Sequence, residues 1–261
     1  MKLPIKNNPH LHVFIGYDDR EPLEWQVARK SILSNASRPI SVYPLRHRTL
    51  RDIGLFKRPW RTDEQGIVHD ELDTRPFSTQ FAFIRFLVPA YANYLGIDPR
   101  DFCVFMDSDF VNMQDMYLLL EEQDLSRFPV WCVKHDYQPA NVIKMDSQIQ
   151  TSYSKKNWSS FMVFNRTSPL CGPTVEAVNT MPGAWLHGFG WLDTPDDVAM
   201  IGGLHEGWNF LPDHSEPRVP DSEIRNIHYT EASPLMKPLC KYSAPFNQYL
   251  RNVLQDMGAA L

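Results

Sequence analysis

The chain has 261 residues, of which 43% are hydrophobic and 12% aromatic, enough apolar material for the core of one large α/β domain. Its net charge of −5, from 26 basic and 31 acidic residues, gives no overall positive field for a nucleic-acid backbone. Nucleic acid is therefore disfavoured as a partner, and a local basic surface would have to come from the arginine-rich stretch 46–61.

Targeting and cysteine signals are weak. No apolar signal segment precedes the first charged residues, and no window approaches the roughly 18 apolar residues of a membrane span. We therefore expect a cytoplasmic protein without a transmembrane segment. The four cysteines lack the spacing of a zinc site and the density of a disulfide scaffold, so we expect reduced, mostly buried thiols.

The first third of the chain alternates β-rich apolar runs with an amphipathic segment, the pattern of strands that cross over through helices. The run "HVFIGY" (12–17) predicts a strand, and the segment 21–37 predicts a helix whose first turn suits Pro22. The run "ISVYPL" (40–45) predicts the next strand. The polar stretch 46–76 is too irregular to assign.

The stretch 77–96 carries the strongest helix signal. Pro89 within it removes an amide that would bond to the carbonyl of Arg85, so we expect a kink near that arginine. Its apolar residues recur at intervals of three and four, as on one face of a helix: Phe77, Phe81, Ile84, Val88, Tyr91 and Leu95.

Three further apolar runs predict strands. The run "DFCVFMD" (101–107) is continuous, which is typical of a central parallel strand covered on both faces. The runs at 129–136 and 159–165 have the same character. Beyond residue 170 the sequence becomes rich in loops, with islands of aromatic residues, glycine and proline.

Two aspartates one residue apart, Asp107 and Asp109, end the most apolar strand candidate. In an open α/β sheet the ligand crevice lies beyond the carboxyl ends of the strands, and in an extended backbone residues two apart point to the same side. Two carboxylates that close repel each other unless a cation lies between them. Mg²⁺ or Mn²⁺, held by carboxylates and substrate phosphates, would meet that need. The alternative is an acidic turn without a ligand.

The stretches "VFIGYDDRE", "STQFAFIRFLVPAY" and "FMDSDFV" together resemble the nucleotide-sugar glycosyltransferases of the GT-A fold. They are most similar to glycosyltransferase family 8, the group of glycogenin and the bacterial lipooligosaccharide galactosyltransferases. The landmarks keep the family's order over roughly residues 12–238. The resemblance implies a Rossmann-type mixed α/β sheet flanked by helices, with a loop-rich C-terminal part. It also implies a single domain over 1–261, with a nucleotide-binding part at about 1–125 and a sugar and acceptor part at about 126–261.

The resemblance also assigns site residues. It implies that Arg85 helps to position the diphosphate and the acidic pair, and that Asp107, Asp109 and His228 hold Mn²⁺ or Mg²⁺. Contacts to the nucleotide are implied for the turn after the first strand and for the residue between the two aspartates: Gly16, Tyr17, Asp18, Asp19 and Ser108. The alternatives are helix capping by the acidic turn and a purely structural histidine.

Some family landmarks are altered. The family often has Asn-x-Gly where this chain has residues 158–160, Trp-Ser-Ser. The lysine of its Gly-x-x-Lys-Pro run, which meets the diphosphate, corresponds to the displaced Lys237. The acidic residue near the reacting sugar matches Asp193, with Asp196 and Asp197 as rivals.

The function that we expect is transfer of a sugar, with retention, from a nucleoside diphosphate sugar to a hydroxyl acceptor, carbohydrate or other. UDP is the expected nucleotide. Two alternatives remain open. A nucleotidyltransferase also uses paired aspartates on an α/β sheet, but usually shows a glycine-rich phosphate loop, whereas the first strand here is followed by "GYDDRE". A non-catalytic relative that binds a nucleotide or a glycan would tolerate the altered landmarks.

Overall fold

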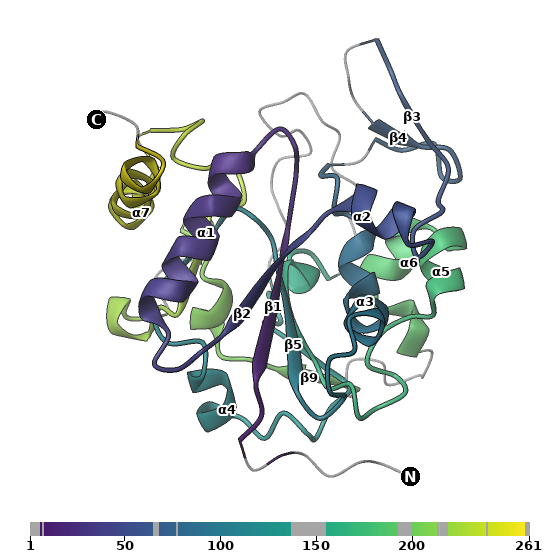
Figure 1. Ribbon diagram of the computed structural model, residues 1–261, viewed down its shortest axis with the longest axis horizontal. Helices are drawn as coiled ribbons and strands as arrows, with labels where there is room; N and C mark the ends of the chain where they lie inside the picture. The colour runs from purple at the N-terminus through teal and green to yellow at the C-terminus, as the bar shows by residue number, and fades with distance from the viewer. Residues whose placement is uncertain are drawn as a thin grey trace.

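A computed structural model describes residues 6, 8–64, 68–76, 78–136, 155–192, 200–212, 214, 219–238 and 240–258. Its centre is a six-stranded sheet in the order β2-β1-β5-β8-β7-β9 (Figure 1). The strands are β1 (Leu11–Gly16), β2 (Ser41–Leu45), β5 (Phe102–Met106), β7 (Val130–Cys132), β8 (Phe161–Phe164) and β9 (Ile201–Gly203). The predicted mixed α/β sheet is thus confirmed, and each predicted strand is present. The first is shifted by one residue, and the other four are shorter than predicted.

The directions of the strands place most of their carboxyl ends at one edge of the sheet. β1 runs parallel to β2 and β5, and β9 runs parallel to β7, while β8 is antiparallel to both β5 and β7. Five strands therefore end at the same edge, where β8 begins. Loops at that edge are the expected place for a ligand in an open α/β sheet.

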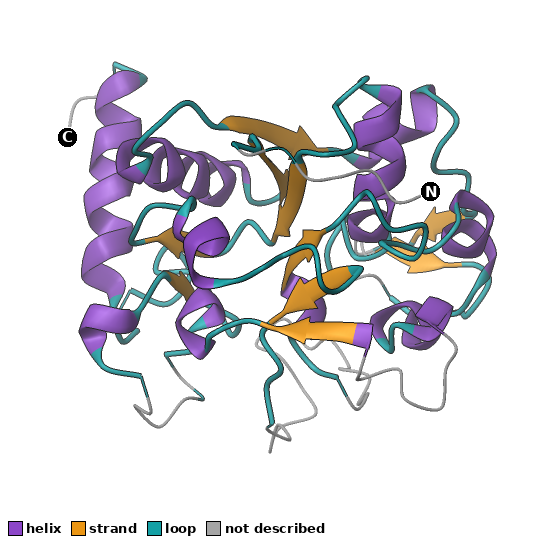
Figure 2. Cartoon of the chain, turned by 90° about the horizontal axis from the view of Figure 1, so that it is seen from below, coloured by secondary structure: helices purple, strands orange, loops and turns teal. Residues whose placement is uncertain are grey.

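Helices cover both faces of the sheet (Figures 1 and 2). On one side, α1 (Pro22–Asn35) and α7 (Ser243–Asp256) lie side by side. On the other side lie α3 (Val88–Tyr94), α5 (Val175–Thr180) and α6 (Gly183–His187). Two short helices, α2 (His47–Asp52) and α4 (Leu118–Glu122), complete the layers.

Short elements extend this frame. Two small antiparallel ribbons pair β6 (Phe110–Asn112) with β10 (Asn226–His228) and β3 (Trp60–Thr62) with β4 (Val68–Asp70). The 3₁₀ turns are η1 (Ile84–Leu87), η2 (Trp158–Ser160), η3 (Gly190–Leu192), η5 (Glu206–Asn209) and η6 (Asp221–Glu223).

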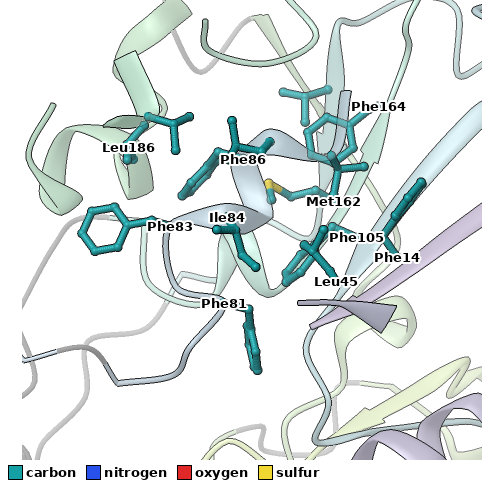
Figure 3. Packing of buried hydrophobic residues seen from close by; sticks show 14 of the residues in the cluster. Phe14, Leu45, Phe81, Phe83, Ile84, Phe86, Phe105, Met162, Phe164 and Leu186 are labelled. Atoms are coloured by element: carbon teal, nitrogen blue, oxygen red, sulfur yellow. The ribbon is translucent and has the colours of Figure 1, made fainter. Parts of the chain in front are cut away.

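The alternation of side chains along the strands divides the core into two layers. Val13 and Ile15 of β1 pack with α1, whereas Phe14 between them packs with α3. Figure 3 shows the second layer, in which Phe105 and Met162 from the sheet meet aromatic side chains of the segment before α3. Because both faces of β5 are buried, its sequence reads as a continuous apolar run.

The helix predicted over 77–96 is wrong in its first half. The chain forms turns up to Phe83, then η1, and α3 begins only at Val88. Pro89 suits the first turn of α3, where its missing amide costs no hydrogen bond. The backbone before it is bound elsewhere, since the amide of Gln80 donates to Asp18 at 3.0 Å. The kink expected near Arg85 is not a bend within one helix, because Arg85 lies in η1 and the α-helix begins only after it; Phe77 lies outside the described residues.

A buried ion pair fastens the unassigned stretch 46–76, which forms α2 and the β3–β4 ribbon. Arg58 donates to Asp70 from Nε at 2.6 Å and from Nη2 at 2.7 Å, and both side chains are buried. The guanidinium also lies 4.1 Å from the ring centroid of Phe83. The ribbon is therefore joined to the segment that precedes α3.

The remaining expectations concern membranes and thiols. Within the described ranges, the chain has no helix whose length and apolarity would allow it to cross a membrane. The four cysteines are free thiols, and three of them are buried, as expected.

Candidate metal and nucleotide site

Three of the predicted site residues meet at the edge of the sheet where five strands end. Asp107 directly follows β5, the chain turns at Ser108 and Asp109, and β6 then begins. β10 pairs with β6 so that His228 lies opposite Phe110, next to Asp109. One ligand atom from each of the two aspartates and His228 lies within 4.8 Å of the others. The two carboxylates thus converge through a turn rather than through the extended backbone that we expected.

Arg85 holds the first aspartate. Its Nη1 lies 3.0 Å from Asp107 Oδ1 and donates to the carbonyl of Ser159 at 3.0 Å. The guanidinium is only 5% exposed and lies 4.9 Å from the ring centroid of Phe105. The backbone amide of Asp107 donates to the carbonyl of Ser160 at 3.0 Å. Arg85 therefore lies beside the acidic pair and forms an ion pair with one of its carboxylates, while its contact with a diphosphate stays a prediction.

Contacts with Phe110 and Asn209 fix the ring of His228. It is 2% exposed and stacks on Phe110 with ring centroids 4.1 Å apart. Its Nε2 lies 3.3 Å from Asp109 Oδ1, and its Nδ1 lies 2.8 Å from the side-chain oxygen of Asn209. Asn209 was not among the predicted site residues. It stands between two aromatic residues, Trp208 and Phe210, but nothing in that sequence pattern shows which histidine the amide faces.

The donor set fits a hard divalent ion. Two carboxylate oxygens and one imidazole nitrogen make a mainly oxygen-ligated site, which suits Mn²⁺ or Mg²⁺. The surroundings are also strongly negative. Burial, followed by the charges of Asp109, Asp18 and Glu24, raises the pKa of Glu21 to about 7. A cation at Asp109 would relieve this repulsion between carboxylates.

The turn after β1 is closely packed. A Cβ atom at Gly16 would lie 2.5 Å from Cγ of Phe81, so the strand can end there only with glycine while that ring keeps its place. The ring of Tyr17 is half-buried, with the guanidinium of Arg46 3.6 Å from its centroid. Asp19 is exposed, and its Oδ2 lies 3.4 Å from Nη2 of Arg48.

Asp18 is buried and organises the turn. Its carboxylate accepts hydrogen bonds from the backbone and the side chain of Arg20 and from the backbone amide of Gln80. Burial alone would raise the pKa of this carboxyl, but these donors outweigh it and leave the pKa lowered. A direct contact of Asp18 with the nucleotide stays a prediction.

The other predicted residues are more dispersed. Ser108 is buried in the turn between the two aspartates. Lys237 follows β10 in the chain and forms an ion pair of 3.2 Å with Glu231. Asp193, together with its rivals Asp196 and Asp197, lies outside the described residues.

Residues 158–160, which carry the altered landmark, form hydrogen bonds with residues around the site. Trp158 donates from Nε1 to the carbonyl of His135 at 2.9 Å, and Ser159 Oγ lies 2.8 Å from Nδ1 of His187. Burial, and then the charge of Arg85, lower the pKa of His187 to about 3, so its ring is neutral. Residues 158–160 are thus linked to the acidic pair, because Arg85 donates to the carbonyl of Ser159 and forms an ion pair with Asp107.

The fold is that of solved glycosyltransferases. The bifunctional glycosyltransferase WbbM matches 98% of this chain with a TM-score of 0.57 and 15% identity, and this chain spans 52% of its length. The galactosyltransferase LgtC, solved with donor and acceptor sugar analogues, matches with a TM-score of 0.54 and 14% identity over 92% of this chain and 95% of its own. GlyE of Streptococcus pneumoniae matches 96% of this chain and 63% of its own, with a TM-score of 0.50 and 13% identity. The chain therefore has the GT-A glycosyltransferase fold, which confirms the resemblance at the level of structure.

The sequence itself defines a family. The chain is 36% identical over 225 residues to Protein CDI of Arabidopsis thaliana, an alignment that covers 85% of this chain and 78% of that relative. The chain belongs to the family of Protein CDI. No family model matches it.

Proposed function

We propose that the chain is a glycosyltransferase that moves a sugar from a UDP-sugar to a hydroxyl acceptor, in a reaction that requires Mn²⁺ or Mg²⁺. The observation that carries this proposal is the convergence of Asp107, Asp109 and His228 within 4.8 Å at the carboxyl edge of a GT-A sheet. The fold makes sugar transfer the activity to test first. UDP as the nucleotide and retention of configuration rest on the resemblance to glycosyltransferase family 8.

Electrostatics explain why a metal is part of the proposal. A diphosphate is an anion, and the carboxylates of Asp107 and Asp109 would repel it. Arg85 supplies one buried positive charge, but that charge already faces Asp107 at 3.0 Å. A divalent cation between the carboxylates and the diphosphate turns the repulsion into attraction on both sides.

Each residue then has a defined task. When bound, Mn²⁺ or Mg²⁺ supplies Lewis-acid stabilisation of the negative charge that builds on the leaving diphosphate. Arg85 orients Asp107, and the stack on Phe110 orients His228. Lys237 is assigned to the diphosphate through the family resemblance. Asp193 is assigned to the surroundings of the reacting sugar through the family resemblance.

Hydrolysis of the donor without an acceptor tests the proposal. UDP-glucose, UDP-galactose and their N-acetyl derivatives are each incubated with the full chain in Mn²⁺, in Mg²⁺ or in a chelator, and released UDP is measured. We expect slow UDP release with at least one donor, dependence on the metal, and loss of activity in Asp109→Asn. The matched control is Asp98→Asn, which alters a carboxylate in the loop before β5, at the opposite edge of the sheet, and should keep the activity.

Two results would count against the proposal. Full activity of Asp109→Asn, or activity in the chelator, would show that the acidic pair holds no catalytic metal. Metal-dependent binding of UDP without turnover of any donor would instead favour the non-catalytic relative.

A further inference from the structure

We infer that Asn209 is a positioning residue of the metal site: its amide selects the ring tautomer of His228 that presents the lone pair of Nε2 to the metal position. This inference rests on the proposed function, because it concerns the same metal site. It assigns a role to a buried side chain at the end of η5, outside the three ligand positions.

The hydrogen bonds of Asn209 determine which way its amide faces. The side chain is 0% exposed, and its nitrogen lies 3.0 Å from the carbonyl oxygen of Asn157 and 2.9 Å from Oγ of Ser160. A backbone carbonyl only accepts hydrogen bonds, so the amino group must lie on that side. The amide oxygen therefore faces Nδ1 of His228, at 2.8 Å.

The orientation of the amide determines the tautomer. An amide oxygen only accepts, so Nδ1 of His228 must carry the hydrogen. A neutral imidazole has one N–H group, which leaves a lone pair on Nε2, the atom 3.3 Å from Oδ1 of Asp109. The opposite tautomer would direct an N–H group at the metal position and could not bind a cation through Nε2.

Neighbouring groups agree with this assignment. Ser160 donates its hydroxyl hydrogen to the carbonyl of Asn157 at 2.6 Å, so towards Nδ1 of His228, at 3.4 Å, its oxygen can only accept.

The stack on Phe110 and the bond to Asn209 impose separate constraints. Stacking at 4.1 Å and 17° fixes the plane of the imidazole, but it does not distinguish its two nitrogens. The hydrogen bond that Nδ1 donates to the amide oxygen of Asn209 distinguishes them. Metal-binding histidines generally donate their second N–H group to such a partner, and loss of the partner typically lowers metal affinity 10- to 100-fold.

A purely structural role for Asn209 predicts a different outcome. A buried amide that only satisfies Asn157 and Ser160 would affect folding stability and leave metal binding unchanged. Asn112 provides the matched control, since it is equally buried and donates to the side chain of Asn226 at 2.9 Å within the β6–β10 ribbon.

The first experiment measures Mn²⁺ affinity by titration calorimetry for the full chain, Asn209→Ala and Asn112→Ala. We expect Asn209→Ala to weaken Mn²⁺ binding roughly 10- to 100-fold, and Asn112→Ala to lower stability to urea without changing the affinity. Equal affinity of Asn209→Ala and the unaltered chain would overturn the inference, as would an equal loss in both variants. No Mn²⁺ binding by the unaltered chain would count against the proposed function itself.

The second experiment needs no variant of Asn209. NMR of the ring nitrogens in the metal-free chain, at a pH above the ordinary imidazole value of about 6.5, reports the tautomer of each histidine. The signals of His228 are identified by their absence in His228→Gln. We expect the hydrogen on Nδ1; a hydrogen on Nε2 would overturn the inference even if Asn209→Ala does not fold.

Discussion

Arg58 and Arg85 show how a single residue type serves the fold at one place and the site at another. Arg58 is buried with Asp70 and joins the β3–β4 ribbon to the segment before α3. Arg85 is equally enclosed, but its partner Asp107 is a proposed metal ligand. The sequence alone does not separate the two arginines, because their partners lie 12 and 22 residues further along the chain and neither spacing leaves a local signal.

The Arg58–Asp70 pair should be essential to stability. Asp70→Asn removes the charge that is hydrogen-bonded to the buried guanidinium and leaves only Asp73, whose Oδ2 lies 3.9 Å from Nη2 of Arg58. Breaking a buried pair on one side typically costs about 3–5 kcal/mol. We expect a loss of that size in the free energy of unfolding from urea denaturation. The double variant Arg58→Met with Asp70→Leu removes both charges and should be more stable than Asp70→Asn. A loss below about 1 kcal/mol in Asp70→Asn would show that the pair is not desolvated in the way its burial indicates.

Gly16 should resist even the smallest side chain. A Cβ atom at that position would lie 2.5 Å from the ring of Phe81, which is buried and cannot simply move aside. Gly16→Ala should therefore destabilise the chain by about 1–3 kcal/mol in urea unfolding. In the control, Gly203→Ala, the nearest atom lies 3.9 Å from the new Cβ, and we expect little change. Equal stability of the two variants would contradict the packing described for the end of β1.

At the level of elements, periodicity predicted the strands well and the helix before Asp107 poorly. The continuous apolar run of β5 predicts a strand that is buried on both faces, because a strand with one solvent-exposed face would alternate apolar and polar residues. Apolar residues at helical spacing in 77–96 are buried, as Phe81 and Ile84 show. However, Phe81 lies in a turn and Ile84 in the 3₁₀ turn η1, not in an α-helix. The decisive contact, from the amide of Gln80 to Asp18, joins residues 62 positions apart and leaves no periodic signal.

The site divides in the same way. The paired aspartates and the late histidine could be found because their residue types and order match a known family. Asn209 and Glu21 could not be found, since an amide or a carboxyl acquires its role only from the groups that face it in space. Asn209 faces His228, 19 positions later, and Glu21 is influenced by Asp109 from another strand end.

For the whole molecule, three partly buried histidines predict loss of stability in mild acid. Burial first, and then a neighbouring charge, lower the pKa of His12 and His135 to about 4 and that of His187 to about 3. Each favours the folded state above its unfolded pKa of about 6.5 and loses that contribution as the pH falls towards 4. Glu21 acts in the opposite sense, because its raised pKa of about 7 lets the folded chain bind a proton first.

As the pH is lowered, the stability lost through three imidazoles exceeds the stability gained through one carboxyl. The melting temperature of the metal-free chain should therefore decrease as the pH falls from about 6.5 to about 4.5. His12→Gln, at the edge of the sheet opposite the metal site, should make that dependence shallower. Thermal unfolding followed by circular dichroism over this range checks both expectations. A melting temperature that rises as the pH falls would contradict the assignment of neutral rings.

We propose that Asp107, Asp109 and His228 hold a metal against a nucleoside diphosphate. The most direct test is the melting temperature of the chain with UDP, GDP, ADP or CMP, each with and without Mn²⁺, since a ligand that binds only the folded state stabilises it. We predict a shift for UDP that requires Mn²⁺ and disappears in Asp109→Asn. If no nucleotide gives a metal-dependent shift, or if Asp109→Asn shifts as the unaltered chain does, the acidic pair is a structural turn.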